Sequence, residues 1–265
     1  MTTILLLGFT VGIILALTGA GGGILAVPLL VFGAGLSMAE AGPIGLLAVG
    51  LAALLGAIMG LKAGTVRYKA ALLISVTGIL FSPLGLWLAQ RMPNRPLTIV
   101  FAFVLLFVAW RVFQKSMPST GQDQTAQRIP PCQIDSSKGK LIWTAPCARA
   151  LALAGVAAGG LSGLLGVGGG FVMVPALQRY TNLATQSILA TSLAVIALVS
   201  MSGVVASTLS GHLQWTIALP FSGGALAGMI AGRLVAARLS GSLLQKGFAI
   251  VSALVAVALL IKALR

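Results

Sequence analysis

The chain has 265 residues, 58% of them hydrophobic and 8% charged, whereas a soluble domain carries roughly 25% charged residues. This composition excludes a water-facing shell and indicates a multi-pass membrane protein. The net charge of +14 is typical of span ends that contact anionic lipid, and no basic stretch is interleaved with exposed aromatics, so we expect a lipid bilayer as partner and no nucleic acid.

Two halves of similar design follow one another along the chain. Each opens with an apolar segment that glycines interrupt and continues with three uninterrupted spans, and a polar segment rich in Pro, Ser and Gln separates the halves. In chain order the predicted elements are 4–32, 43–61, 70–90, 97–113, the polar segment 114–140, 151–177, 187–209, 216–237 and 243–263. We expect a first transmembrane repeat, a linker and a second transmembrane repeat at 1–113, 114–147 and 148–265.

An internal repeat relates the two halves. A shift of 147 residues, from Gly8 to Gly155, superimposes one series of glycines and a proline on another. The first series is Gly8, Gly12, Gly19, Gly21, Gly22, Gly23 and Pro28, and the second is Gly155, Gly159, Gly166, Gly168, Gly169, Gly170 and Pro175. Because the gaps match as well as the residues, we predict an all-α integral membrane protein built from two homologous repeats.

The runs GAGGG (19–23) and GVGGG (166–170) place glycine inside membrane segments. Three explanations are open: close helix packing, a plain kink, and a helix break whose freed N–H groups face a substrate. Broken helix is tolerated in hydrocarbon only where it lines a cavity or is buried in protein. Since the runs occupy matching positions, we favour the break and predict substrate binding at Gly21, Gly22, Gly23, Gly168, Gly169 and Gly170.

The distribution of basic residues favours a re-entrant hairpin over a simple span for each interrupted segment. With hairpins, each half crosses the membrane three times and the halves are inverted. Every Lys and Arg then lies on the same side of the membrane as the linker, except Arg91, Arg95, Lys262 and Arg265. By the positive-inside rule we expect a cytoplasmic linker and both termini outside. Arms of about ten to fifteen residues would reach the middle of the bilayer at 1.5 Å per residue.

Two glycine-rich turns that lead into half-helices can bind an anion without a buried cation. Main-chain N–H groups and helix dipoles supply the positive potential. Hydroxyls are the expected side-chain ligands: Ser75, Ser222, Ser187, Thr191 and Ser192. For each hydroxyl, a bond to its own helix or to a neighbouring helix is the alternative.

Few titratable groups remain near the spans. Glu40 and His212 are expected in short loops, where Glu40 is either a solvated acid or a proton-coupling group and His212 is interfacial. With so few ligating side chains, the sequence predicts no metal and no cofactor. Cys132 and Cys147 lie in or beside the linker without metal-type spacing, and we expect free thiols, with a disulfide as the alternative.

The spacing GxxxGxxxxxxGxGGGxxxVP that opens each half resembles the TauE/SafE family of sulfite and organosulfur exporters. The runs TSLAV (191–195) and SGHLQW (210–215) look like that family's second-half pattern, whereas IGLLAV (44–49) departs from it in the first half. The resemblance covers nearly the whole chain outside the linker. It implies transport of sulfite, sulfonates or related organosulfur or carboxylate anions across a bacterial cytoplasmic membrane.

The sequence therefore predicts a secondary transporter of a small anion, with alternating access around a midplane site. A passive channel would need a continuous polar lining, and a membrane-embedded enzyme would need an acid/base pair, a nucleophile or a metal cluster inside the spans. A lipid or assembly factor is a further alternative. We expect no enzyme activity and leave the oligomeric state open, with a homodimer as one option.

Overall fold

The computed structural model describes residues 1–19, 21–116, 131–132, 143–209, 211, 213–236 and 241–264. Within these residues the chain forms ten helices and no strand, which confirms the all-α prediction. In chain order the helices are α1 (Thr2–Thr18), α2 (Gly21–Gly33), α3 (Met38–Lys62), α4 (Tyr68–Arg91), α5 (Asn94–Ser116), α6 (Ala145–Leu165), α7 (Gly170–Tyr180), α8 (Thr185–Leu209), α9 (Trp215–Ala236) and α10 (Gly241–Leu264). His212, Asp123 and Asp135 lie outside the described residues.

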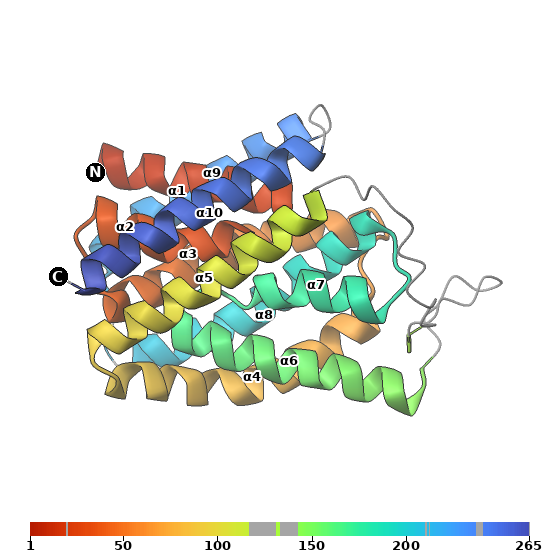
Figure 1. Ribbon diagram of the computed structural model, residues 1–265. Coiled ribbons are helices and arrows are strands. Elements are labelled where there is room, and N and C mark those ends of the chain that lie inside the picture. Colours follow the sequence, from red (N-terminus) through yellow and green to blue (C-terminus); the bar gives the residue numbers. More distant parts are fainter. Residues whose placement is uncertain are drawn as a thin grey trace.

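Five helices of the described chain are long and apolar enough to cross a membrane: α3, α4, α6, α8 and residues 215–234 of α9. At 1.5 Å per residue, the 25 residues of α3 measure about 37 Å, which exceeds the roughly 30 Å hydrocarbon core of a bilayer. The helices run side by side along one general direction (Figure 1), as the spans of one bilayer do. The prediction of a multi-pass helical membrane protein is confirmed.

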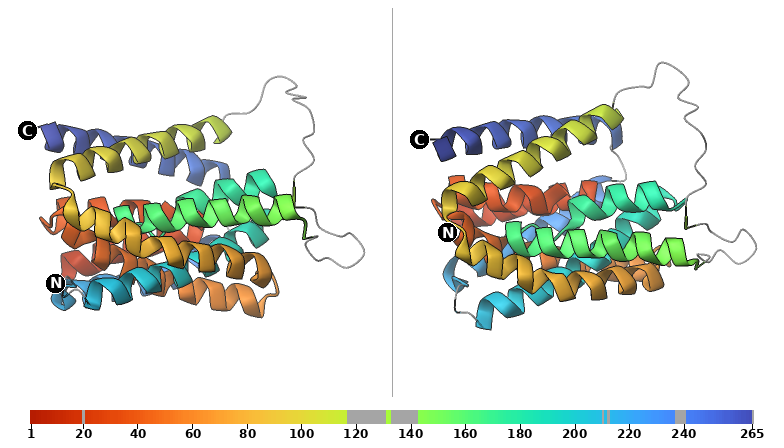
Figure 2. Two further views of the ribbon diagram at one scale, coloured as in Figure 1. Left: turned by 90° about the horizontal axis from the view of Figure 1, so that it is seen from below. Right: turned by 60° about the horizontal axis from the view of Figure 1, so that its bottom comes forward.

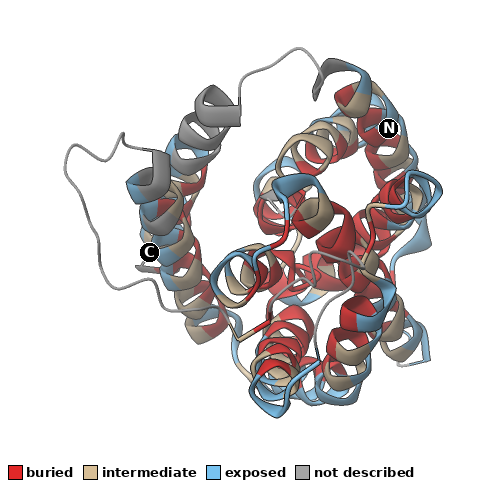
Figure 3. Cartoon of the chain, turned by 90° about the vertical axis from the view of Figure 1, so that its right-hand side faces the viewer, coloured by how far each residue is buried: buried red, intermediate tan, exposed pale blue. Residues whose placement is uncertain are grey.

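Helices α3 and α8 form an antiparallel pair at the centre of the bundle. A Cβ placed on Gly50 of α3 would lie 2.9 Å from Cβ of Ser200, and a Cβ placed on Gly60 would lie 2.9 Å from Cβ of Ala190. Residues later in α3 therefore contact residues earlier in α8, so the two helices run antiparallel. Most side chains of both helices are buried, and buried residues gather in the middle of the bundle (Figure 3).

Two outer pairs, α1 with α9 and α4 with α6, pack closely through small residues. Gly8 of α1 lies directly against the carbonyl oxygen of Phe221 in α9, and Gly155 of α6 lies in the same way against Ile74 in α4. The two contacts are equivalent under the 147-residue shift, which relates Gly8 to Gly155 and Ile74 to Phe221. Small residues allow helix backbones to approach closely inside a membrane. Helices α5 and α10 form a third pair at one side of the bundle (Figure 2).

Each interrupted segment folds back on itself. Along the first, Gly22 of α2 lies near Leu15 of α1 and Gly33 lies near Leu7, so α2 returns antiparallel to α1. The arms have 17 and 13 residues in the first hairpin and 21 and 11 in the second. The expected arm length is wrong for α1 and α6. In α6 the extra length arises partly because the helix already begins at the polar end of the bundle, where Arg149 is exposed.

The equivalent helices α3 and α8 run in opposite directions, as their contacts show. Both termini lie at one end of the bundle, whereas α5 ends and α6 begins at the other end (Figure 1). Depth and sidedness in a bilayer, together with the re-entrant nature of the hairpins, stay predictions.

A disulfide closes the base of the second hairpin. Cys132 and Cys147 are bonded and fully buried, and the amide of Cys132 donates to the carbonyl oxygen of Tyr180 at 3.1 Å. The bond therefore joins the start of α6 to the segment that pairs with the end of α7. The expectation of free thiols is wrong, because the return of α7 brings the linker cysteine to α6, a contact that cysteine spacing does not reveal.

Candidate substrate-binding site

Both glycine tracts end a helix at the equivalent residue. Helix α1 is followed by Gly19 and α6 by Gly166, each with φ of 70°. Their N–H groups donate to the carbonyl oxygens of Leu15 and Ser162 at 2.8 and 2.9 Å. Glycine adopts this left-handed conformation without a steric penalty and is the usual residue at such helix ends. The break predicted at each tract is present.

The two tracts differ after the break. Gly21, Gly22 and Gly23 form the first turn of α2, so the first tract is helical from Gly21 onward. In the second tract, Gly168 and Gly169 keep positive φ values of 77° and 68°, and α7 begins at Gly170. Two residues separate α1 from α2, whereas the four residues 166–169 separate α6 from α7.

The tips of the two hairpins meet in the interior. Gly23 lies directly against the carbonyl oxygen of Val167 in the other tract. A Cβ placed on Gly168 would lie 3.1 Å from a methyl carbon of Ile196 and 3.5 Å from one of Val49. These two residues lie near the middles of α8 and α3, so the second tip reaches the mid-length of the central pair.

The arrangement brings two helix N-termini toward each other inside the bundle. The first amides of α2 and α7, which include those of Gly22, Gly23 and Gly170, have no acceptor within their own helices. Each N-terminus also carries the positive end of a helix dipole, equivalent to roughly half an elementary charge. Such a pair of termini can bind an anion through main-chain donors alone.

Close packing accounts for part of the glycine content. A Cβ on Gly22 would lie 2.6 Å from the carbonyl oxygen of Val11, and a Cβ on Gly169 would lie 2.6 Å from that of Ala158. Each returning arm thus needs glycine in order to lie against its partner. Two of the explanations left open by the sequence, the break and close packing, act together.

Ser75 and Ser222 occupy equivalent positions on α4 and α9. Both are buried, and neither hydroxyl has a hydrogen-bond partner among the described residues. Ser75 lies seven residues before Ser82, whose hydroxyl oxygen is 3.7 Å from a Cβ placed on Gly203 of α8. Two helical turns separate these serines, so Ser75 belongs to the face of α4 that meets the central pair.

The hydroxyl cluster at the start of α8 lies beside the first tip. A Cβ placed on Gly19 would lie 3.1 Å from Cβ of Leu189, between Ser187 and Thr191 in sequence. Ser192 is fully buried and has no partner within the described chain, whereas Ser187 is half-buried. Thr191 has a structural partner, since its hydroxyl accepts from the Arg67 amide at 3.1 Å.

Ser200 is a candidate ligand that sequence reasoning missed. It is fully buried, its hydroxyl has no partner among the described residues, and a Cβ placed on Gly168 would lie 2.8 Å from its Oγ. By contrast, Ser202 and Ser207 donate to carbonyl oxygens of their own helix at 2.7 and 2.8 Å. A usable signal was the spacing of eight residues from Ser192, which puts both hydroxyls on one helix face.

Glu40 lies in the first turn of α3, so the expectation of a loop position is wrong. Its carboxylate accepts from the amide and hydroxyl of Ser37 at 3.0 and 2.7 Å and from Nε2 of Gln214 at 3.1 Å. With the Ser37 hydroxyl accepting from the Glu40 amide, this is a capping box. Helix capping gives Glu40 a structural role, and a part for Glu40 in proton coupling stays a prediction.

Comparisons with known proteins give a family match and two similar membrane proteins. The family model described as sulfite exporter TauE/SafE matches residues 4–259. A "Probable membrane transporter protein" of Xylella fastidiosa (strain 9a5c) is 29% identical over 256 residues. The match covers 94% of this chain and 91% of the Xylella protein. The "Probable membrane transporter protein YunE" of Bacillus subtilis (strain 168) is 28% identical over 241 residues, with coverages of 88% and 86%. No solved structure matches the chain.

Proposed function

We propose a substrate class and a mechanism for this protein on the premise that it belongs to the sulfite exporter TauE/SafE family and is a multi-pass bacterial membrane transporter, not an enzyme. The substrate is a small anion: sulfite, a sulfonate, or a related organosulfur or carboxylate anion. It binds between the two hairpin tips, where main-chain amides of the glycine tracts donate to its oxygens.

The observation that carries this proposal is the contact between Gly23 and Val167. It supports a single site shared by both tracts, with the N-termini of α2 and α7 on either side. Neutral donors suit a carrier, because a full cation buried in lipid is costly and would hold an anion too tightly for release.

Buried hydroxyls complete the proposed site. An unpaired hydroxyl in the interior costs about 1–3 kcal/mol, so a ligand or water that pairs with it is stabilised. Ser200 is the first choice because its Oγ lies beside Gly168. Ser192, Ser75 and Ser222 have the same unpaired state in the described chain and are further candidates.

Antiparallel halves support alternating access as the mechanism. When one repeat rocks against the other, exchanging the conformations of two inverted repeats turns an outward-open state into an inward-open one. Each hairpin carries one half of the site. Movement of α1–α2 against α6–α7 therefore opens the site to one side while closing the other.

Flux into liposomes carrying the purified protein tests the proposal. Uptake of sulfite, sulfoacetate, thiosulfate and acetate is followed over a concentration series, with protein-free liposomes as the control. We expect saturable uptake of at least one of these anions, and faster uptake when the liposomes are preloaded with the same anion. Flux that rises linearly without saturation indicates a channel, and no uptake of any of the four contradicts the substrate class.

A further inference from the structure

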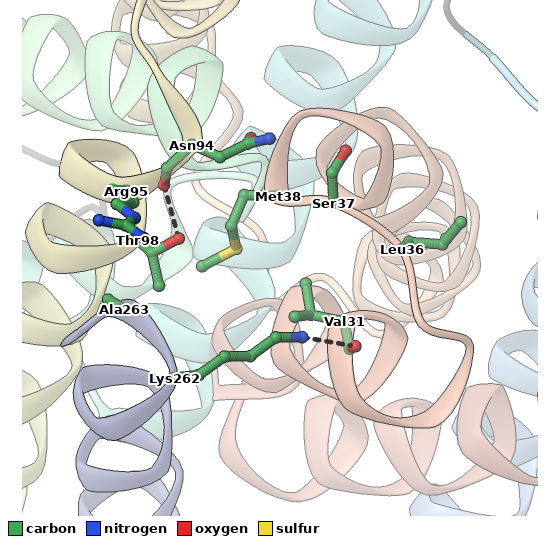
Figure 4. A pocket seen from close by; sticks show the side chains of 9 residues that line it. All are labelled: Val31, Leu36, Ser37, Met38, Asn94, Arg95, Thr98, Lys262 and Ala263. Carbon is green, nitrogen blue, oxygen red and sulfur yellow. Dashed lines mark hydrogen bonds between the residues drawn. The ribbon is translucent and has the colours of Figure 1, made fainter. Parts of the chain in front are cut away.

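A pocket of about 210 Å³ lies at the end of the bundle that carries both termini. The first hairpin, the start of α3 and the α5–α10 pair surround it (Figure 4). It is separate from the glycine tips, because about 15 Å of α2 lies between Val31, which lines the pocket, and Gly21.

Two cations line this pocket, Arg95 of α5 and Lys262 of α10. Lys262 Nζ donates to the carbonyl oxygen of Val31 at 3.4 Å, a long bond that leaves its two other protons available. In the described part of the chain, the guanidinium of Arg95 makes no hydrogen bond or ion pair. Among the described residues the lining includes no Asp or Glu, and Glu40 is held by Ser37 nearby. The pocket is therefore net positive.

Helix ends of both signs lie at this pocket, so the helix dipoles largely offset one another and the two cations set its charge. Helices α3 and α5 begin at the pocket, so the positive ends of their dipoles lie there. Helices α2 and α10 end there, and Lys262, in the last turn of α10, donates to the carbonyl oxygen of Val31 near the end of α2. Arg95 lies in the first turn of α5, where the helix dipole disfavours a cation. An anion bound beside Arg95 removes that conflict.

The remaining lining is largely apolar. Val31, Leu36, Met38 and Ala263 contribute hydrocarbon surface next to the two cations. Figure 4 shows Lys262 reaching toward Val31, with Met38 between that side chain and Arg95. A charged group with an attached organic part would satisfy both kinds of surface.

We propose that this pocket binds a tetrahedral oxyanion, either sulfate-like or phosphate-like, through Arg95 and Lys262. An apolar substituent of the ligand lies against Val31 and Met38. Two sources share this chemistry: a soluble anion near the mouth of the transporter, and the headgroup of an anionic lipid. The inference does not rest on the proposed transport site, since the two sites share no residue.

Binding measurements on the purified full-length chain test the pocket in two series. In the first, inorganic sulfate is titrated calorimetrically into protein in phosphatidylcholine nanodiscs. In the second, native mass spectrometry follows phosphatidylglycerol retained by the protein. The test variants are Arg95→Gln combined with Lys262→Gln, and Ala263→Leu, which fills the pocket without changing its charge. Arg91→Gln is the matched control, because Arg91 lies at the same end over the Trp87 ring, at 4.1 Å, and outside the pocket.

We expect the double variant to bind at least one probe about tenfold or more weakly, as loss of charge-assisted hydrogen bonds predicts. Ala263→Leu should weaken the same probe several-fold, and Arg91→Gln should leave it unchanged. An effect on sulfate identifies a soluble anion, and an effect on phosphatidylglycerol identifies a lipid headgroup.

Three outcomes would overturn the proposal. The first is equal binding of both probes by the wild type and the double variant. The second is an equal loss in Arg91→Gln, which would reveal a general effect of surface charge. The third is unchanged binding in Ala263→Leu. Elution volume and melting temperature show whether the double variant folds, and if it does not fold, the result for Ala263→Leu decides the question. Gly23→Ala changes the proposed transport site only, so it should bind the pocket probes as the wild type does. Failure of the transport proposal can therefore be told apart from failure of the pocket proposal.

Discussion

The main chain of Gly23, at the start of α2, lies directly against the carbonyl oxygen of Val167, between α6 and α7. This contact joins the two hairpins at their tips, so neither tract can change its backbone conformation without disturbing the other. Coupling of this kind is what a site shared by two repeats requires. Because of this contact, a single Cβ added at Gly23 should disturb both tips.

Gly23→Ala tests the contact between the tips. The new methyl group overlaps the Val167 carbonyl, and overpacking of this kind destabilises by about 1–3 kcal/mol. We expect a lower melting temperature and a reduction in liposome uptake on the order of tenfold or more, because small displacements at a binding site are costly. Gly160→Ala is the control, since a Cβ at that position of α6 has no neighbour within 4 Å. Normal uptake by Gly23→Ala would contradict the shared site.

Ser200→Ala separates a substrate-binding role from a structural one. The Ser200 hydroxyl has no partner in the described chain, so its removal should leave the melting temperature unchanged or raise it. If the hydroxyl binds the anion, KM for uptake rises about tenfold or more, because a hydroxyl that donates to an anion forms a charge-assisted hydrogen bond of about 1.5–3 kcal/mol. Ser207→Ala, which loses a bond to the Gly203 carbonyl, should leave KM unchanged. An identical KM in both variants would assign Ser200 to helix packing.

The disulfide should contribute measurably to stability. Cys132 and Cys147 are 15 residues apart, and closing a loop of that length stabilises by about 3 kcal/mol in the chain-entropy view. We expect Cys147→Ser, or treatment of the purified protein with reductant, to lower the melting temperature. An unchanged melting temperature under full reduction, verified by mass, would show that the contacts between α6 and α7 hold the hairpin alone.

The redox state of this pair in cells reports on the side of the membrane. The end of the bundle where α5 ends and α6 begins is joined by the linker and has most of the positive charge, so by the positive-inside rule we predict that it lies in the cytoplasm, where disulfides are rare. Acid-quenched cells, denatured and treated with a maleimide mass tag, should therefore show two tags per chain, and oxidised purified protein should show none. Absence of tags in cells would place the linker end in an oxidising compartment and reverse the predicted orientation.

The Gly-Pro spacing in the two halves was sufficient to predict where helices break, because a left-handed turn and a close backbone contact both select glycine. Gly19 and Gly166 have the same φ and equivalent hydrogen bonds, as their matching positions require. The unwound extent of each tract was not predictable in this way. Gly21 and Gly168 are equivalent in sequence, yet the first lies in α2 and the second has a left-handed φ of 77° before α7 begins.

Interactions between distant segments account for what sequence reasoning missed. Ser200 looks like any serine of an apolar helix until Gly168 is placed beside it. The pairing of Cys132 with Cys147 depends on the return of α7 to the base of α6. Glu40 was expected in a loop, although Ser37 three residues earlier is a helix-capping signal that could have placed it in α3.

Hydrophobicity, charge and glycine periodicity are properties of single segments, and they were enough to establish a helical membrane protein and to predict two matched halves with broken first segments. A bilayer imposes such rules on each segment independently, since every span must satisfy its own backbone. Which helices lie together, and hence the meeting of Gly23 with Val167 and the Arg95–Lys262 pocket, depended on three-dimensional packing. Contacts of this kind form between residues far apart in the chain, where no local pattern records the partner.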